Sequence, residues 1–345
     1  MRIGIARSST VMILLATCLT ISNSAAAQGQ QPSNQSTAGI GADELPTNAA
    51  APQDTGFSGS EQVASTQPPT QPEWFPLPAD QQQHVDQLLD FWQKSSDQVH
   101  QCTCEFTLWE YDPTFCAYRN PQSQELAAHS VWRGTIRHAS PDKALYETNE
   151  AWRFAITDDK PNLEKVEDEN IKQKWVCDGK YTYNYDFVNK KLIDMPIPSE
   201  FQGQGLVNSP LPFLFGADRQ TLQSRFWIRP ITPANAKDEY WLEAIPKQLA
   251  DARIYSRVEL VIARQDFLPK SMILFAPNYD PKEHPVSQAF VFENRTINGN
   301  LEAIKDFFGG FIRPKTPFGW ERVEQKPFAD DSITAQKEEL ERTRK

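Results

Sequence analysis

Four cysteines in the central part of the chain carry the chemistry that is simplest to define, namely Cys102, Cys104, Cys116 and Cys177. In an exported protein an even number of thiols suggests disulfides, and four cysteines permit three pairings. Cys102 and Cys104 are two residues apart, so on a strand they share a face and each would need a partner from elsewhere. A zinc site would need paired C-x-x-C or histidine spacings, which the sequence lacks. The spacing predicts disulfides or buried thiols, and no metal site.

Sequence templates for catalysis are missing. The chain has no G-x-S-x-G, no H-E-x-x-H and no glycine pattern for phosphates or dinucleotides. Its five histidines are scattered without ligand spacing. The acid-rich stretch at 158–169 lacks the alternating acids and glycine of a calcium loop, so it predicts a solvated loop. We therefore expect no enzyme activity and no cofactor.

The acidic balance of the chain argues against nucleic acid as a partner. The formal net charge is −10, and it becomes −12 if a leader containing Arg2 and Arg7 is removed. Binding to phosphates needs a basic face, which this composition does not favour. Acidity alone does not identify a partner, because it is commonly a solubility feature.

The elements that must position these side chains are mostly strands. Apolar and polar residues alternate at 102–109, 132–137, 257–262 and 290–292, which is typical of half-buried strands. Turn signals occur at 178–180, 188–190 and 298–300. Strands joined by short turns, with few long helices, indicate an antiparallel sheet or open barrel. The predicted fold class is therefore mainly β.

One helix is expected before the strands. Pro78, Ala79 and Asp80 form a helix start, and apolar side chains then recur at a spacing of three to four residues. These are Val85, Leu88, Leu89 and Trp92. The spacing predicts an amphipathic helix with one buried stripe.

The aromatic content, at 11% of the chain, points to a large apolar surface on one side of the strands. A flat sheet needs a second layer to bury such a surface, whereas a curved sheet can hold an apolar ligand. The apolar segment 208–216 interrupts the strands and begins with a helix-start signal. Its composition favours a plug at one end of the sheet, and the alternative is a lid over an apolar cavity.

The beginning of the chain predicts export. Residues 1–27 have a positive start, an apolar run at 11–21 and small side chains leading to Ala27, as in a secretory signal. The apolar run is too short to span a bilayer, which takes about 20 residues. Lipidation at Cys18 is the alternative, but Thr17 fits a lipoprotein box poorly. Cleavage near Ala27 is favoured, which predicts a periplasmic or secreted protein.

The rest of the chain divides by composition. Residues 28–72 are rich in Gln, Ser and Pro and cannot bury enough apolar surface to fold, so they predict a disordered linker. Residues 73–320 are long enough for one domain with a substantial core. Residues 321–345 are highly charged and predict an exposed tail.

Several blocks in this domain follow a familiar order. A glycine-led strand at 132–137 precedes Pro141, and residues 175–186 are similar to the hairpin "SDGKTLWxYxP". The apolar segment 209–215 comes next, followed by 240–247, which resembles an "F-x-L-x-P-K" strand. Together these blocks resemble the periplasmic lipoprotein carrier LolA and its LolB and RseB relatives.

This resemblance implies an incomplete antiparallel β-barrel with an N-terminal helix and a short apolar lid helix. It implies a cavity for acyl chains lined by Phe106, Leu108, Trp132, Ile136, Leu260, Ile262, Ile273, Phe275, Phe290 and Phe292. The lid would carry Leu211, Phe213, Leu214 and Phe215. Carriers of this family close the lid with an arginine near the glycine-led strand, and Arg137 is the nearest candidate. Here Pro141 follows Arg137 by four residues rather than directly.

The function implied is a carrier of lipid or lipoprotein that sequesters acyl chains, with membrane-bound donor or acceptor proteins as further partners. Two alternatives stay open. One is an envelope-stress sensor of the RseB type that regulates an anti-sigma partner. The other is a structural module whose barrel is filled by its own aromatic side chains.

Overall fold

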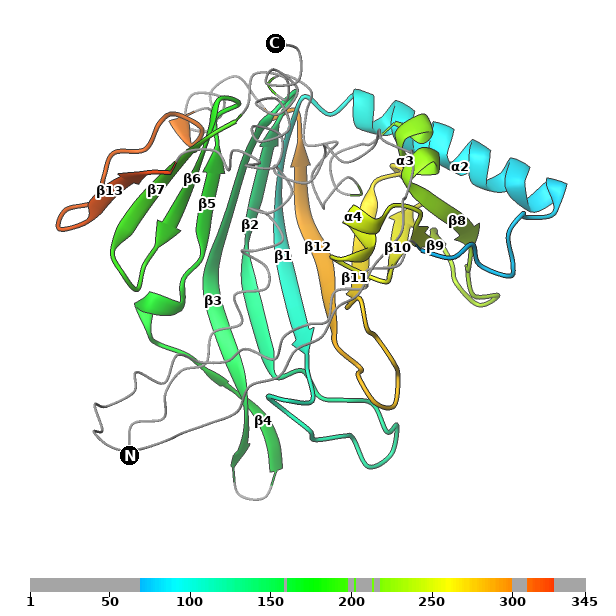
Figure 1. The fold of residues 1–345 in the computed structure, drawn as a ribbon, viewed down its shortest axis with the longest axis horizontal. Helices are drawn as coiled ribbons and strands as arrows, with labels where there is room; N and C mark the ends of the chain where they lie inside the picture. The colour runs from blue at the N-terminus through cyan, green and yellow to red at the C-terminus, as the bar shows by residue number, and fades with distance from the viewer. Residues whose placement is uncertain are drawn as a thin grey trace, which may run out of the picture.

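The computed structural model describes residues 69–157, 160–197, 202, 213, 218–299 and 309–325. The predicted signal peptide, including Cys18, and the predicted linker up to residue 68 lie outside these residues. Leu211, Leu214 and Phe215 of the predicted lid also lie outside them. The described part is shown in Figure 1.

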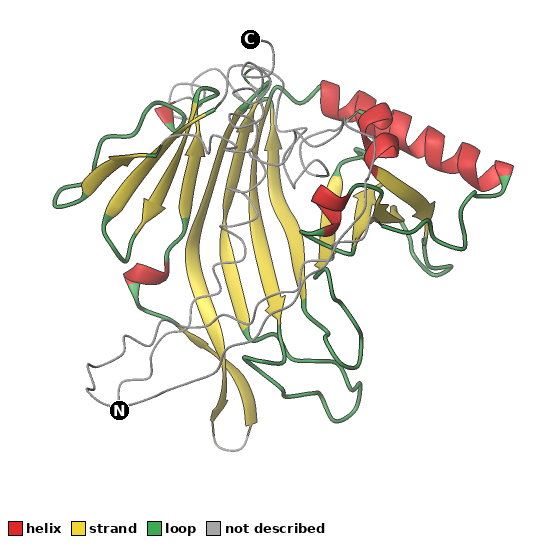
Figure 2. Ribbon diagram, in the orientation of Figure 1, coloured by secondary structure: helices red, strands yellow, loops and turns green. Residues whose placement is uncertain are grey.

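Strands dominate the described chain, and its longer helices gather at one end of the sheet (Figure 2). The helices are α2 (Ala79–Asp97), α3 (Arg219–Arg225), α4 (Leu249–Ala252) and a 3-10 helix (Glu169–Ile171). The first seven strands are β1 (Gln101–Tyr111), β2 (Ser130–Ala139), β3 (Lys143–Thr157), β4 (Lys160–Lys165), β5 (Lys174–Cys177), β6 (Tyr181–Asp186) and β7 (Lys191–Pro196). The others are β8 (Phe226–Pro230), β9 (Glu239–Pro246), β10 (Arg257–Ala263), β11 (Pro269–Phe275), β12 (Ser287–Ile297) and β13 (Glu321–Glu324).

The predicted helix is confirmed as α2. Pro78 occupies the position before its first turn, where a missing backbone N–H costs little. The apolar stripe of Val85, Leu88, Leu89 and Trp92 is buried, each side chain being at most 3% exposed. Most of the other side chains are polar, and the half-exposed Phe91 stacks on Phe267, so α2 is a surface helix with one packed face. No helix in the described part of the chain is long and apolar enough to cross a membrane.

All strands of the described residues join one 13-stranded sheet in the order β13-β7-β6-β5-β3-β2-β1-β12-β11-β10-β9-β8, with β4 added beside β3. The pairs are antiparallel except β13 with β7. The order ends in two different strands, β13 and β8, which stand at opposite edges of the curved sheet (Figure 1). The predicted mainly-β fold with an open, incomplete barrel is confirmed. The domain boundary predicted at residue 320 is too early, because Glu321–Glu324 forms β13.

One face of this sheet is apolar, and we call it the inner face. It is defined by a row of directly paired residues that crosses five strands: Trp132, Leu108, Phe290, Met272 and Leu260. These side chains belong to one buried cluster with the stripe of α2. The helix crosses the β8 to β10 end of the sheet, with α3 beside it (Figure 1). The core therefore lies between the inner face and α2.

The opposite, outer face is covered at one edge by the chain around residues 309–325. Phe311 packs with Leu145 and Tyr183 in a second, smaller cluster. Beside it, the buried carboxylate of Asp194 accepts hydrogen bonds from Arg313 and Arg322, at 2.9 and 2.8 Å. This segment thus holds the outer face of β5 to β7, and it takes no part in the inner face.

The middle of the inner face depends on a glycine. A Cβ added to Gly134 would stand 2.0 Å from the carbonyl oxygen of Glu147 and 2.7 Å from the ring of Phe106. The register between β2 and β3 shifts at this point, which brings the neighbouring backbone close. Gly134 therefore lets the Phe106 ring lie flat on the sheet, stacked on Tyr146 at 4.8 Å.

We expect Gly134→Ala to lower the free energy of unfolding by about 3 kcal/mol, because neither the Glu147 carbonyl nor the Phe106 ring can retreat without disturbing the core. Urea denaturation followed by tryptophan fluorescence measures this change. Gly299→Ala is the matched control, since its nearest contact would be an ordinary 3.8 Å to Thr296. Equal stabilities of the two variants would show that the close approach at Gly134 is not restrictive.

Candidate functional site

The inner face brings together most of the residues that the sequence predicted for an apolar cavity. Eight of the ten lie in the cluster under α2: Phe106, Leu108, Trp132, Ile136, Leu260, Ile262, Phe290 and Phe292. They come from β1, β2, β10 and β12, whose pairing sets them in adjacent rows. Whether this surface receives a ligand is a separate question from its packing.

Two predicted cavity residues lie on the wrong face. Ile273 pairs with Glu259 and Ala289, and Phe275 pairs with Arg257 and Ser287, one residue out of step with Met272. Both side chains therefore point to the outer face. There the guanidinium of Arg257 lies 3.9 Å from the centre of the Phe275 ring. Met272 and Leu274 take the inner positions instead.

Among the described residues, α2 packs over the β8 to β10 end of the inner face, with its apolar stripe in the same buried cluster. Of the four residues predicted for a lid, only Phe213 falls within the described residues, where it is buried with its ring 5.0 Å from that of Phe226. The predicted clasp is not supported, because Arg137 alternates with Ile136 on β2 and pairs with Thr103 and Leu145. Strand alternation thus places the Arg137 side chain on the outer face.

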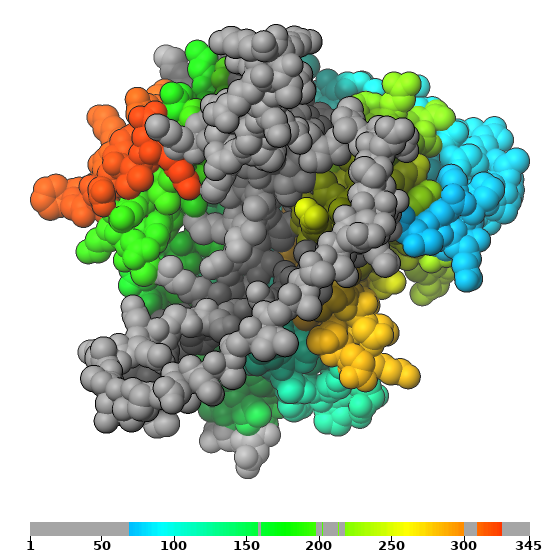
Figure 3. Space-filling view, in the orientation of Figure 1, coloured from blue at the N-terminus to red at the C-terminus, as the bar shows by residue number. Residues whose placement is uncertain are grey.

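Polar side chains join α2 to α3 along a line that we call the seam. Arg219 of α3 is 2.7 Å from Asp86 and 3.0 Å from Asp90, both on α2. Gln223 donates a 2.8 Å hydrogen bond to Asp86, and the backbone N–H of Arg219 donates to Gln93. In Figure 3 the two helices lie directly against each other. Because these groups are partly exposed, each ion pair contributes about 0–1 kcal/mol to the stability of the folded protein.

The connection from α2 to β1 is held by one asparagine. The Asn298 side chain accepts hydrogen bonds from the backbone N–H groups of His100 and Gln101 and donates to the carbonyl of Gln98. Asn298 has φ +49°, a left-handed conformation that asparagine tolerates. The C-terminal end of α2 is therefore fixed to the sheet through β12, whereas the middle of the helix is fixed to α3.

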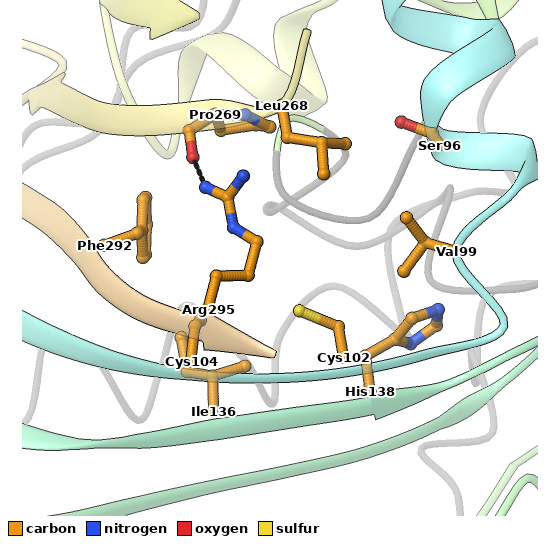
Figure 4. Close-up of a pocket in the computed structure, with 10 residues that line it drawn as sticks. All are labelled: Ser96, Val99, Cys102, Cys104, Ile136, His138, Leu268, Pro269, Phe292 and Arg295. Atoms are coloured by element: carbon orange, nitrogen blue, oxygen red, sulfur yellow. Dashed lines mark hydrogen bonds between the residues drawn. The ribbon is translucent and has the colours of Figure 1, made fainter. Parts of the chain in front are cut away.

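Packing between this end of α2 and the sheet leaves a cavity of about 50 Å³. Val99, Ile136, Leu268 and Phe292 supply apolar walls, while Cys102, Cys104, His138 and Arg295 supply the reactive or charged groups (Figure 4). Arg295 enters it because β12 carries an extra residue opposite Cys104, where Asn294 has φ +50°. Its guanidinium is held by Asp266, at 3.1 Å, and by the carbonyl of Pro269.

All four described cysteines are free thiols in the structure. Cys104, Cys116 and Cys177 are buried, and Cys102 is partly exposed. This arrangement corresponds to the buried-thiol alternative from the sequence rather than to disulfides. The described residues contain no group of three or more His, Cys, Asp or Glu side chains placed to hold a metal ion.

The sequence did not reveal a polar row at one end of the inner face, made of Arg153, Ser130, Glu110 and Gln288, which pair in that order across the sheet. Glu110 is only 3% exposed. Its carboxylate accepts from the hydroxyl of Ser130 and the indole of Trp132, both at 2.7 Å, and from Gln288. Every second side chain of β1 from Cys102 to Leu108 faces inward, and Glu110 is the next in this series. That spacing is the sequence signal that could have assigned Glu110 to the inner face.

His129 also contacts this row, but the geometry is not that of a hydrolytic triad. Its Nδ1 lies 2.9 Å from the Ser130 hydroxyl, so the serine stands between the histidine and the carboxylate of Glu110. In a triad the histidine stands between the other two. Burial lowers the pKa of His129 below its ordinary value. The row is therefore a satisfied polar network.

A second cavity, of about 170 Å³, borders the inner face near this row. Trp132, Thr148 and Ala151 line its sheet side, and Lys165 and Lys172 lie on its other side together with the acidic residues 167–169. The acidic stretch thus includes β4 and the 3-10 helix rather than a loop alone. This cavity offers charged groups of both signs next to the apolar surface.

Two polar groups inside the main cluster have no partner among the described residues. They are the indole N–H of Trp92, on α2, and the hydroxyl of Tyr146, on β3. Burial, together with the charge of Glu110, raises the pKa of Tyr146, so its hydroxyl keeps its proton. Two donors of this kind would be satisfied by an oxygen acceptor brought into the core.

Comparison with known proteins concerns the fold. No family model and no curated protein matches this sequence. An uncharacterized conserved protein from Thermus thermophilus has a similar structure, with 10% identity and a TM-score of 0.37 over 70% of this chain and 99% of that one. A LolA superfamily protein from Nitrosomonas europaea has 8% identity and a TM-score of 0.27 over 63% and 96%. MucB, in complex with MucA(peri), has 11% identity and a TM-score of 0.27 over 63% and 56%. None of these likenesses reaches 25% identity or a TM-score of 0.5, so they say nothing about the function of this chain.

His138, in the wall of the smaller cavity, makes the stability of the site depend on pH. Burial lowers its pKa to about 4, although its Nδ1–H donates to the carbonyl of Lys143 at 3.2 Å. The unfolded chain has a histidine pKa near 6.5 and binds a proton first as pH falls. The free energy of unfolding is therefore not reduced by His138 above about pH 6.5. It falls as the pH drops from about 6.5 to about 4, because the unfolded chain takes up a proton that the buried His138 does not.

Between pH 7 and pH 5 we expect the wild-type protein to lose about 2 kcal/mol more stability than His138→Asn, whose amide can still donate to Lys143. Urea midpoints at the two pH values measure the difference. His100→Asn, at an exposed position, is the control and should follow the wild type. Parallel pH profiles for His138→Asn and the wild type would show that His138 is not held neutral by burial.

Proposed function

We propose that this protein binds the acyl chains of a lipid or lipoprotein against its inner face, in place of α2. The observation that carries the proposal is the continuous apolar inner face whose cover is a separate helix packed by a single stripe. An acyl chain offers this surface the same kind of contact as Val85, Leu88, Leu89 and Trp92 do. An exported carrier in the periplasm would use such an exchange to hold acyl chains away from water.

Binding in this manner requires α2 to move. The remaining cavity of about 50 Å³ cannot hold an acyl chain, since benzene already occupies a cavity of about 150 Å³. In this structure α2 packs against the surface that the acyl chain would contact, so the proposal requires an opened state. Asn298 provides a fixed point at the C-terminal end of α2, about which the helix would swing away from the sheet.

The polar features of the site fit a ligand with a polar head. The unpartnered hydroxyl of Tyr146, on the inner face, would be satisfied by an ester or amide oxygen at the start of an acyl chain. The larger cavity beside Trp132 would accommodate charged head-group atoms near Lys165 and Lys172. Both features support a lipid or lipoprotein over a bare hydrocarbon.

A structural module with a permanently filled barrel is the second candidate. The observation that favours it is the present packing, in which Trp92, Phe106, Phe213 and Phe226 are each at most 2% exposed. In that case α2 is a fixed layer of the core, and no ligand replaces it. The two candidates differ in whether the cluster opens.

We expect the full-length protein to take up a fluorescent fatty-acid probe and to carry an acylated species in native mass spectrometry after purification from its own envelope. Val99→Phe should reduce probe affinity about tenfold, because the larger ring fills the cavity where α2 meets the sheet and so stabilises the closed position of the helix. Val188→Phe is the matched control, at an exposed turn. A protein that binds neither lipid nor probe would be assigned to the filled-barrel candidate.

The seam supplies a second prediction, in the opposite direction. Arg219→Met removes the ion pairs to Asp86 and Asp90, which should increase the rate of probe uptake about threefold by making the opening of α2 easier. Stopped-flow fluorescence measures this rate. Lys191→Met breaks a comparable exposed pair with Glu321, far from α2, and should leave uptake unchanged. An uptake rate that does not respond to Arg219→Met would mean that α2 is not the moving cover.

A further inference from the structure

The two thiols in the smaller cavity form an arrangement that lipid binding does not use. Cys102 and Cys104 both lie on the inner side of β1, paired with His138 and Ile136 of β2. Figure 4 shows the Cys102 sulfur pointing into the space between β1 and Val99. Cys102 is partly exposed whereas Cys104 is 7% exposed, so a small molecule would reach Cys102 first.

The charges around the pair favour a thiolate on the more accessible sulfur. The hydrogen bond with the Cys104 thiol, followed by the positive charge of Arg295, lowers the pKa of Cys102 below its usual value, against burial and the charge of Asp266. The same hydrogen bond, with burial and the Cys102 charge, raises the pKa of Cys104. The neighbouring His138 is neutral at pH 7, since burial lowers its pKa to about 4. One thiol is thus prepared as a nucleophile and the other keeps its proton.

The two side chains lie two residues apart on the same side of β1. Residues two apart on an extended strand have Cα atoms about 6.6–6.8 Å apart, at the upper end of the range that a disulfide spans. The register between β1 and β12 shifts between Thr103 and Glu105, at Cys104 itself. The extra residue lies on β12, and the pairing of β1 with β2 stays regular across Cys102–Cys104, so a disulfide closed here would be strained and readily reduced.

We propose that Cys102 and Cys104 form a redox-active dithiol that reacts with small organic disulfides at the mouth of the cavity and closes to an intramolecular disulfide. This inference does not rest on lipid binding. Cys116 and Cys177 lie apart from the pair, in other parts of the fold, and are not included.

The reaction consists of two thiol–disulfide exchanges. The Cys102 thiolate attacks one sulfur of the small disulfide, whose S–S bond breaks, and the departing thiolate takes up a proton. In the resulting mixed disulfide Cys102 has no charge, so the interactions with Cys102 that held the proton on Cys104 are removed. Cys104 then loses its proton and attacks the Cys102 sulfur, and the second small thiol leaves. The protein loses two hydrogens and the small disulfide gains them.

The test uses the reduced full-length chain and bis(2-hydroxyethyl) disulfide as the probe. After incubation at neutral pH, free thiols are alkylated and the cysteine peptides are analysed by mass spectrometry. We expect a disulfide between Cys102 and Cys104, with Cys116 and Cys177 alkylated. In Cys104→Ala the reaction should stop at a stable hydroxyethyl adduct on Cys102, formed at least about tenfold faster than any adduct on Cys177. Cys177→Ala is the control and should form the same disulfide as the wild type.

Two results would overturn the proposal. One is a wild-type protein in which both thiols stay open to alkylation after the incubation. The other is a persistent mixed disulfide on Cys102 in the wild type, which would show that Cys104 cannot resolve it. Both are measured on the unaltered chain, so they stand even if Cys104→Ala does not fold. Failure of fatty-acid uptake would leave either result unaffected.

Discussion

Burial of one apolar sheet face is the requirement on which this structure depends. The sheet does not close on itself, so the row from Trp132 to Leu260 would face water without a cover. Among the described residues, α2 packs four buried side chains into this cluster at the β8 to β10 end, each contributing about 1.5–3 kcal/mol. The seam with α3 and the Asn298 connection then act on a helix whose position is already set by apolar contact. Polar groups orient the cover, and the hydrophobic effect holds it.

Local irregularities decide where this apolar face ends and what lies at its margins. Gly134 and the register shift beside it let β3 approach β2, so the Phe106 ring can lie flat. The extra residue of β12 turns Arg295 toward the cavity and sets it beside Cys104. At the other end the inner alternation continues into Glu110, whose carboxylate is satisfied by its paired neighbours. The two margins therefore carry most of the polar groups of this face, and the hydroxyl of Tyr146 lies in its middle.

The sequence predicted those helices and strands in which apolar residues recur at one regular spacing, either helical or alternating. The stripe of α2 and the alternation of β1 determine their buried faces without tertiary information. The run from Met272 to Phe275 is apolar at every position, so only the pairing with β10 and β12 shows that Ile273 and Phe275 face outward. Arg137 was placed near a lid by analogy, although its alternation with Ile136 already indicated the outer face. The amphipathic stripe of α2 predicts its own buried face, because a helix with one apolar face must bury it, whereas Leu211, Leu214 and Phe215 of the predicted lid lie outside the described residues.

The two covers can be compared by the apolar surface that each buries. Burial of the α2 stripe contributes on the order of 6–12 kcal/mol, and this is an upper estimate because the unfolded chain is already partly compact. An acyl chain of about 14 methylenes, at about 0.8 kcal/mol each, would contribute about 11 kcal/mol to the same surface. The two covers are thus similar in apolar burial, but a free acyl chain also loses about 4–15 kcal/mol of translational and rotational freedom that the tethered helix does not. The seam, worth about 1 kcal/mol, further favours the helix, whereas the unpartnered hydroxyl of Tyr146 on the inner face would favour a ligand that brings an oxygen acceptor. An exchange of the proposed kind therefore needs a donor that presents the acyl chain at high local concentration.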